Sequence, residues 1–283
     1  MAMLPFCKFH GFGNDYIVFD RNHIKGSVTL PELAVAMCHR NTGVGSDGLA
    51  VLERLDGSVA DYACEIVNPD GSLASFSGNG TRCAVANLYY KAAWPGDSLR
   101  LKTRSGVKLY RLLERKGDEF WFEAEIGAPK FASGDIPVAT PSARDAVLNE
   151  PIALAGGQYT FSAVNVGNPV ACIFMDAFDL DWRQIGREME NHKIFPERTN
   201  VVFVKVTDRE NIDILIWERG AGETAASGTC ATGAAVLSSF LLKTGREVHV
   251  HSPGGTTDVI WRDDDQIVIT GSATLAFCGE WPL

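Results

Sequence analysis

The chain contains one short sequence motif twice, and this duplication constrains the fold more than any other feature. Ser77-Gly78-Asn79-Gly80 and Ser227-Gly228-Thr229 each follow a glycine-rich turn, and each opens a segment with the composition of a buried helix. The two serines stand 150 positions apart in a chain of 283 residues. A repeated helix start predicts two similar halves, each of which aims a small reactive side chain and a helix N-terminus at a shared cleft.

Composition is that of an ordinary globular protein. A hydrophobic content of 46% allows a sizeable core, and a net charge of −9 with interspersed signs argues against nucleic acid as a partner. The first residues lack the pattern of a signal peptide, and no run of about 18 apolar residues predicts a membrane span. We therefore expect a cytoplasmic protein that does not act at a membrane.

The cysteines are scattered, and none forms a CxxC pair or a Cys/His cluster with the spacing of metal ligands. We therefore expect no metal site. An odd number of cysteines at scattered positions predicts reduced thiols that serve mainly as small buried hydrophobic residues. The seven are Cys7, Cys38, Cys64, Cys83, Cys172, Cys230 and Cys278.

Hydrophobic periodicity predicts strands interrupted by four helices. The helices are expected at 30–41, 80–93, 180–192 and 229–245, the last of them capped by Gly245. Alternating apolar residues predict strands over much of the remainder, and the proline-bearing stretch at 128–142 predicts a crossover between halves. The helix at 229–245 is apolar around most of its circumference, so it belongs in the middle of a domain.

These elements predict an α/β (α+β) fold of two pseudo-symmetric domains, each a barrel-like sheet around a central buried helix. The N-terminal domain is expected over 1–130, with the strand at 273–283 returning to it, and the C-terminal domain over 131–272. A homodimer is compatible with the sequence because closed twofold assemblies are common.

Each candidate motif allows a structural and a functional interpretation. A serine at a helix start can simply cap the helix, or the free N–H groups beside it can bind a carboxylate. Arg219, at the end of a strand and beside a glycine loop, can clamp a carboxylate or form a solvated pair with Glu218. Four asparagines at strand ends or in turns suit a zwitterionic amino acid, although each alone is more often a turn residue.

The ordered set of motifs resembles the diaminopimelate epimerase family. The matching segments are FHGFGNDYIVFD, GVGSDGLAVLE, NPDGSLASFSGNGTRC, VNVGNPVACIF, FPERTNVVFV and WERGAGETAASGT, and they spread over nearly the whole chain in the family's order. The resemblance implies a cofactor-independent isomerase that interconverts LL- and meso-diaminopimelate in lysine and peptidoglycan biosynthesis. It implies no cofactor such as pyridoxal phosphate.

The resemblance also implies a site. Two cysteines of the family, one in each domain, flank the α-carbon of the substrate, and they correspond to Ser77 and Ser227 here. Residues that contact the amino-acid substrate in the family correspond to Asn14, Asn68, Gly78, Asn79, Asn168, Asn200, Glu218, Arg219, Gly228 and Thr229.

The chain departs from the family at the positions that matter most. Both proton-transferring positions are serine, Val170 replaces a histidine often found in the family, and Gly48 stands where some members carry glutamine. A thiol has a pKa of about 8.5, whereas an alcohol lies several units higher, and a helix dipole shifts a pKa by less than about one unit. We therefore expect severely weakened turnover with retained binding.

Two rival hypotheses remain open. The first keeps the fold and moves a proton in another small carboxylic or amino acid, with a lysine or carboxylate near Ser77 as the base; Glu223 is the sequence candidate. The second is a binding protein that keeps the amino-acid pocket without turnover. Whether the serines replaced cysteines by engineering or are native also stays open.

Overall fold

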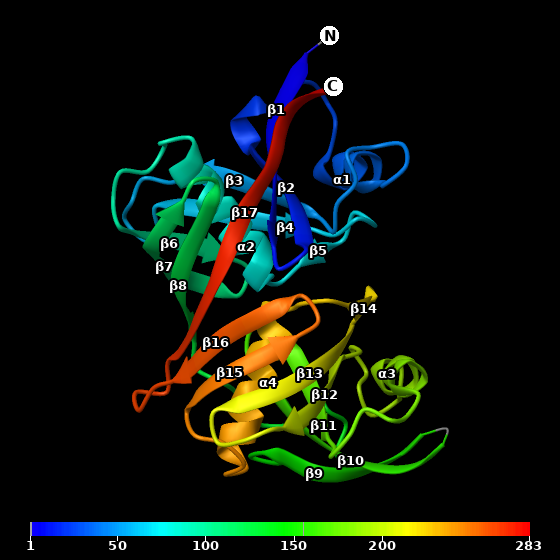
Figure 1. The fold of residues 1–283 in the computed structure, drawn as a ribbon. Coiled ribbons are helices and arrows are strands. Elements are labelled where there is room, and N and C mark those ends of the chain that lie inside the picture. Colours follow the sequence, from blue (N-terminus) through cyan, green and yellow to red (C-terminus); the bar gives the residue numbers. More distant parts are fainter. Residues whose placement is uncertain (1, 155) are drawn as a thin grey trace. The chain divides into compact units, whose positions relative to one another are not determined.

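The computed structural model describes residues 2–154 and 156–283, and the chain divides into two compact units (Figure 1). Unit 1 comprises Met1–Glu125 and Thr270–Leu283, and unit 2 comprises Ile126–Ile269. The expected boundaries at 130 and 272 lie a few residues from these. The C-terminal strand belongs to the same unit as the N-terminus.

Unit 1 is a sheet whose strands follow one another around a ring. Its strands are β1 (Met3–Gly11), β2 (Asn14–Asp20), β3 (Leu49–Arg54), β4 (Tyr62–Val67), β5 (Leu73–Ala74), β6 (Ser98–Thr103), β7 (Gly106–Lys116), β8 (Glu119–Gly127) and β17 (Ile267–Pro282). β17 pairs with β1 on one side and with β8 on the other. Within the described residues, eight of these strands therefore close into a barrel, and the short β5 pairs with β4 outside the ring.

A disulfide joins the two ends of the chain in this barrel. Cys7 on β1 lies directly opposite Cys278 on the antiparallel β17, and the two sulfurs are bonded. The prediction of reduced thiols was wrong for this pair, because linear spacing does not reveal that the first and last strands are neighbours. The other five cysteines, all within the described part of the chain, are free and buried.

The helix α2 (Gly78–Tyr90) is the core of unit 1 and contacts β1 to β4. Its residues from Gly78 to Leu88 are buried, which explains why small and apolar side chains dominate the segment. A second helix, α1 (Leu30–Cys38), begins at a capping box formed by Thr29 and Glu32 and buries Leu33 and Met37 against the outside of the sheet. A short 3-10 helix, η1 (Arg21–His23), follows β2.

Unit 2 repeats the pairing order of unit 1. Its strands are β9 (Val147–Leu154), β10 (Gly157–Asn165), β11 (Pro169–Phe174), β12 (Asn200–Val206), β13 (Asn211–Glu218), β14 (Gly222–Thr224), β15 (Glu247–Ser252) and β16 (Gly255–Trp261). β11–β12 and β13–β15 are parallel, as are β2–β3 and β4–β6 in unit 1, and antiparallel pairs separate them in both. The predicted duplication and the mixed fold class are confirmed.

The helix α4 (Gly228–Phe240) occupies in unit 2 the place of α2 and contacts β10 to β13 as well as β15 and β16. The prediction that it runs to a Gly245 cap was wrong. The helix ends at Phe240, because Leu242 adopts a left-handed φ of 58° and turns the chain away. Gly245 instead donates its backbone N–H to the carbonyl of Arg209.

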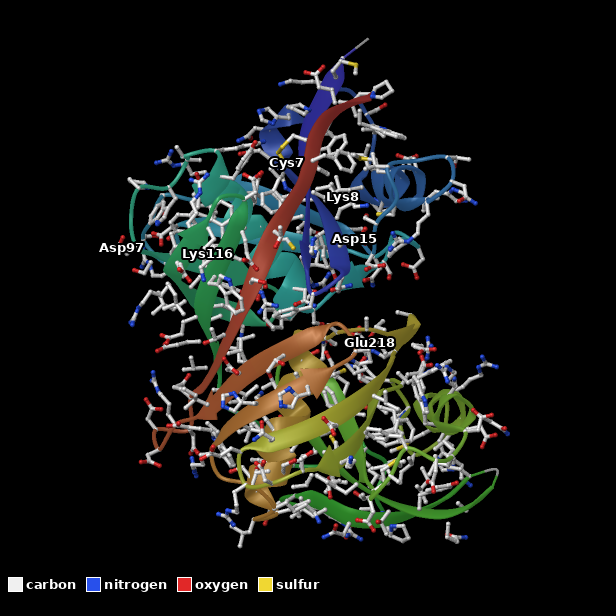
Figure 2. The ribbon with its side chains drawn as sticks, in the orientation of Figure 1. Cys7, Lys8, Asp15, Asp97, Lys116 and Glu218 are labelled. Carbon is white, nitrogen blue, oxygen red and sulfur yellow. A yellow bond between two sulfur atoms is a disulfide. The ribbon has the colours of Figure 1, made fainter. Side chains whose placement is uncertain are left out.

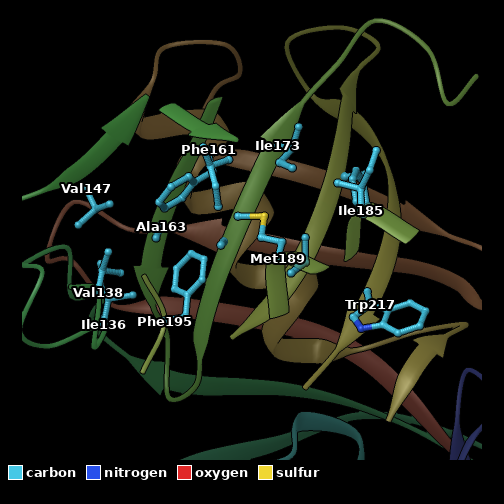
Figure 3. Close-up of a cluster of buried hydrophobic side chains, with 14 of the residues drawn as sticks. Ile136, Val138, Val147, Phe161, Ala163, Ile173, Ile185, Met189, Phe195 and Trp217 are labelled. Atoms are coloured by element: carbon cyan, nitrogen blue, oxygen red, sulfur yellow. The ribbon is translucent and has the colours of Figure 1, made fainter. Parts of the chain in front are cut away.

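The outer face of the unit 2 sheet is covered by α3 (Trp182–Glu190), which packs on β12, β13 and β9. Figure 3 shows the buried cluster that results, in which Ile185 and Met189 of α3 meet Phe161, Phe195 and Trp217. α3 therefore packs on the outer face of this sheet, and the inner face encloses α4. No helix of the described residues is long and apolar enough to cross a membrane.

Candidate active site

The two predicted helix starts have the same local structure. α2 begins immediately after Ser77 and α4 immediately after Ser227, and each helix runs for 13 residues. Both serines have extended backbones, with φ of −137° and −149°. The first backbone N–H groups of a helix lack partners within it, so each start offers donors to an anion. The glycines that follow, Gly78 and Gly228, leave these donors unscreened by side chains.

The hydroxyl of Ser77 serves as an acceptor for its own helix. The backbone N–H of Gly80 donates to Ser77 Oγ at 3.1 Å. On the other side, the hydroxyl oxygen of Tyr16 lies 2.9 Å from Ser77 Oγ, and Tyr16 is 7% exposed. Ser77 is thus held between the helix start and a phenol from β2.

The hydroxyl of Ser227 makes no cap hydrogen bond to α4 and points instead at an acid. Ser227 Oγ donates to Glu218 Oε2 at 2.9 Å, and Thr224 donates to the other carboxylate oxygen at 2.8 Å. Glu218 stands where β13 ends (Figure 2), and the β14 strand returns Thr224 to it. The oxygen of Ser227 therefore faces a carboxylate that can take its proton.

In unit 1 a chain of amides links the helix start to charged groups. Asn79, which is buried, donates from its side chain to Asn14 Oδ1 at 3.2 Å, and Asn14 donates to Asp47 Oδ2 at 2.9 Å. Asn79 Oδ1 in turn accepts a hydrogen bond from the guanidinium of Arg82. Two of the predicted substrate-contacting residues are thereby oriented by the protein before any ligand arrives.

The acids beneath these amides form an ion cluster with two cations. Lys8 lies 2.8 Å from Asp15, and Arg40 contacts both Asp15 and Asp47 (Figure 2 labels Lys8 and Asp15). Burial pushes the pKa of Asp15 upward, but hydrogen bonds from Arg40 and Lys8 outweigh burial and lower it. Burial raises the pKa of Asp47. The cluster fixes Asp47, and through it the amide of Asn14.

In unit 2 a buried asparagine organises the loop that carries the predicted arginine. Asn200 donates to the carbonyl of Pro169 at 2.9 Å and accepts from the backbone N–H of Arg219 at 3.0 Å. The guanidinium of Arg219 donates to the carbonyl of Glu197, and burial lowers its pKa. The guanidinium of Arg219 is therefore held by a backbone carbonyl, without a carboxylate contact of its own among the described residues.

The remaining predicted contacts are placed in two different ways. Thr229, in the first turn of α4, is buried with its hydroxyl 3.5 Å from Ser227 Oγ. Asn68 and Asn168 sit in the turns that follow β4 and precede β11, and the Asn68 side chain donates to Ser72 within its turn. The structure therefore places Thr229 next to Ser227, whereas the Asn68 amide makes its hydrogen bond within the turn that contains it.

Other candidate bases are occupied or buried. Glu223 forms a two-point ion pair with Arg183, at 2.6 and 2.8 Å, and this pair lowers its pKa. Cys230 lies in the first turn of α4, close to Ser227, where burial raises the pKa of its thiol far above the usual value. Burial raises the pKa of Cys83 to about 12. None of the three supplies a ready proton acceptor.

Sequence reasoning missed Tyr16, Arg82 and Asp47. All three lie inside segments already quoted for the family resemblance: Tyr16 in FHGFGNDYIVFD, Arg82 in NPDGSLASFSGNGTRC and Asp47 in GVGSDGLAVLE. For Tyr16 and Arg82 the available signal was a polar side chain at a strand or helix position otherwise filled by core residues, whereas Asp47 lies in a loop and gave no such signal. Only the fold shows that all three converge on the start of α2.

Comparison with known proteins gives a consistent result. The family model described as Diaminopimelate epimerase matches residues 6–131 and 162–276. A diaminopimelate epimerase of Caldanaerobacter subterraneus subsp. tengcongensis is 39% identical over 278 residues, which cover 98% of this chain and 99% of that protein. One from Pelotomaculum thermopropionicum is 39% identical over 281 residues, covering 99% of both.

Solved structures with the same fold are more distant in sequence. A hydroxyproline epimerase from Agrobacterium vitis has a TM-score of 0.70 at 16% identity, covering 99% of this chain and 91% of that one. A methylitaconate-delta-isomerase has a TM-score of 0.63 at 12% identity, with 99% and 95% coverage. At these identities the likeness concerns the fold alone.

Proposed function

The chain belongs to the diaminopimelate epimerase family, and on that premise we propose that it interconverts LL- and meso-diaminopimelate through its two serines. One serine takes the proton from the α-carbon and the other returns a proton. The observation that carries the proposal is the hydrogen bond from Ser227 to Glu218 at 2.9 Å. It supplies a serine oxygen with a base, which the sequence alone did not reveal.

On the deprotonating side, the Cα–H bond breaks and its proton passes to Ser227 Oγ while the Ser227 hydroxyl proton passes to Glu218. A free alkoxide never has to form, because the negative charge is drawn from a carboxylate. Thr224 donates to the other oxygen of Glu218 and orients the carboxylate. Ser77 provides the proton that the carbanion takes up.

Binding of the α-carboxylate is assigned to the helix starts. The backbone N–H groups of the first turns at Gly78–Asn79 and Gly228–Thr229 carry partial positive charge and favour an anion. The amides of Asn14 and Asn79 are held by Asp47 and Arg82, so they are preorganised for a polar ligand. A zwitterionic amino acid is the ligand class that fits donors and acceptors of this mixture.

The rival functions find less support. A carboxylate base at Glu223 is disfavoured, because Arg183 holds both of its oxygens. A binding protein without turnover would have no use for the pairing of Ser227 with Glu218. We further propose the cytoplasm as compartment and a homodimer as assembly; the frequency of closed twofold assemblies favours the homodimer.

The experiment compares the native chain with the double variant Ser77→Cys and Ser227→Cys, in deuterated buffer with diaminopimelate. A thiol is several pKa units more acidic than an alcohol, so the variant should exchange the α-hydrogen at least about 100-fold faster. Calorimetry should give dissociation constants within about threefold for the two proteins. Binding without exchange in both proteins would contradict the proposal.

A further inference from the structure

Tyr16 sits in a slot that two glycines keep open. A Cβ atom at Gly48 would lie 2.9 Å from Tyr16 Cε1, and one at Gly80 would lie 2.9 Å from Cε1 and 3.0 Å from Cζ. Both distances are shorter than van der Waals contact allows, so any larger residue at either position would displace the ring. The slot delivers the phenol to one place, 2.9 Å from Ser77 Oγ.

The hydrogen bonds around Ser77 determine whether its hydroxyl hydrogen is available to donate. A serine hydroxyl has one O–H donor and two acceptor lone pairs. The N–H of Gly80 uses one lone pair. A phenol is a stronger acid than an alcohol, so Tyr16 is the better donor of the pair and uses the second. The hydrogen of Ser77 is then available to a third partner.

Ser227 has the opposite arrangement. It donates its hydrogen to Glu218, and its lone pairs are left to accept a proton, with the hydroxyl of Thr229 at 3.5 Å. Two helix starts with the same backbone conformation therefore present oxygens of opposite character, one prepared to give a proton and the other prepared to take one. The difference arises from the residues that contact the serines, a phenol in one unit and a carboxylate in the other.

We propose that Tyr16 is a further catalytic residue, the proton donor that reloads Ser77 as Ser77 protonates the carbanion. The inference rests on the proposed function and deepens it. In this step the Ser77 O–H bond breaks and a new Cα–H bond forms. At the same time the Tyr16 O–H bond breaks and its proton forms the new O–H bond of Ser77.

The charges balance over one turnover. The carbanion's electron pair forms the C–H bond, and the negative charge moves to the phenol oxygen of Tyr16. Glu218 has meanwhile gained the proton removed through Ser227. Solvent returns a proton to Tyr16 and accepts one from Glu218, which restores the starting state. A turnover in the reverse direction restores it equally.

The relay explains why serine can stand at this position. Without Tyr16, protonation of the carbanion would leave an alkoxide, whose conjugate acid is several pKa units weaker than a phenol. Each pKa unit corresponds to a tenfold change in the proton-transfer equilibrium, so the phenol removes much of that penalty. A cysteine at position 77 would need no such help, because a thiolate is stable near neutral pH.

The test measures α-hydrogen exchange in four proteins: the native chain, Tyr16→Phe, Ser77→Cys, and the variant that combines Tyr16→Phe with Ser77→Cys. Phenylalanine keeps the ring in the slot formed by Gly48 and Gly80 and removes only the hydroxyl. With serine at 77, Tyr16→Phe should lower kcat about 100-fold and change KM by less than about twofold. With cysteine at 77, the same change should cost less than about threefold.

Tyr110→Phe is the matched control. The Tyr110 phenol is also buried and also contacts a hydroxyl of α2, that of Thr81, at 2.5 Å. Its loss should leave kcat within about threefold. An equal loss from Tyr16→Phe with serine and with cysteine at 77 would show a structural role and overturn the relay, as would an unchanged kcat in Tyr16→Phe. Failure of the proposed function looks different, because the native chain and Ser77→Cys would then both show no exchange.

Discussion

Ser227 donates its hydroxyl hydrogen to Glu218 across 2.9 Å, so its side chain pairs with a carboxylate and does not cap α4. A serine that served only to cap α4 would accept from the helix backbone, as Ser77 does from Gly80. Cys230 lies close by, but burial keeps its thiol protonated. The carboxylate is therefore the group through which we propose that unit 2 moves a proton.

Glu218→Gln tests this role with little change of shape. A glutamine can still accept from Thr224, but it cannot take a proton from Ser227. We expect kcat for α-hydrogen exchange to fall at least about 100-fold, while the dissociation constant of diaminopimelate changes by less than about threefold. Deuterium incorporation followed by NMR and calorimetry measure the two quantities.

Glu223→Gln is the control, because Glu223 lies in the same loop and its carboxylate is engaged by Arg183 on the surface. This variant should exchange within about twofold of the native rate. If Glu218→Gln behaved like Glu223→Gln, the carboxylate would have no part in proton transfer.

Arg82→Lys tests the buried cation of α2. Arg82 is 1% exposed and donates to Asn79 Oδ1 and to the carbonyl of Ser272, and no acid of the described residues pairs with it. Lysine offers a single nitrogen and cannot bridge both acceptors. The free energy of unfolding should fall by about 2–3 kcal/mol in urea denaturation, and diaminopimelate should bind more weakly because Asn79 loses its orientation. Native stability and affinity in the variant would show that neither bond matters.

Gly233→Ala tests how closely α4 approaches its sheet. A Cβ at Gly233 would lie 2.8 Å from both Cβ and Cγ1 of Val170 on β11. We expect a loss of about 1–3 kcal/mol in stability, since the backbone must shift to admit one methyl group. Gly245→Ala is the control: its nearest neighbour would be 3.6 Å away, an ordinary contact, so stability should change by less than about 0.5 kcal/mol. Equal effects of the two substitutions would contradict the close packing.

The pH dependence of stability should carry a small signal from His249. Its Nδ1 lies 2.7 Å from Asp258, which raises its pKa, with Asp208 and Glu210 adding to the effect. Because the pKa of His249 is higher in the folded state, its protonation stabilises the fold at pH values below the unfolded pKa of about 6.5. This contribution is lost as the pH rises through the folded pKa. The free energy of unfolding of the native chain should exceed that of Asp258→Asn by about 0.5 kcal/mol at pH 5.5 and equal it at pH 8.5. A difference that grows with pH would contradict this sign.

Most of the fold could be predicted because its signals are local. Helix starts at Ser77 and Ser227 depend on caps and glycines that neighbour them in sequence. The closure of β17 onto β1, and with it the Cys7–Cys278 bond, depends on contacts across the whole chain, and no local pattern encodes those. The end of α4 at Phe240 depended on a left-handed leucine, a conformation that is unfavourable without tertiary packing.

The candidate site was predictable in its positions and not in its chemistry. The motifs located Ser77, Asn14 and Asn79, but the partners that tune them are a tyrosine on β2 and a carboxylate nine positions before Ser227. Hydrogen bonds between residues far apart in sequence follow from strand order and side-chain direction, which a linear reading does not give. The family resemblance therefore assigned the proton-transferring positions to Ser77 and Ser227, but it did not identify the groups that accept or donate a proton beside each serine.

The most direct test of the account is the fate of the α-hydrogen when the native chain meets pure LL-diaminopimelate in deuterated buffer. Proton transfer through Ser227 and Ser77 predicts that meso-diaminopimelate appears, that the inverted carbon carries deuterium, and that Glu218→Gln slows the appearance of both signals at least about 100-fold. Saturable binding of diaminopimelate by the native chain with no deuterium at the α-carbon would contradict it.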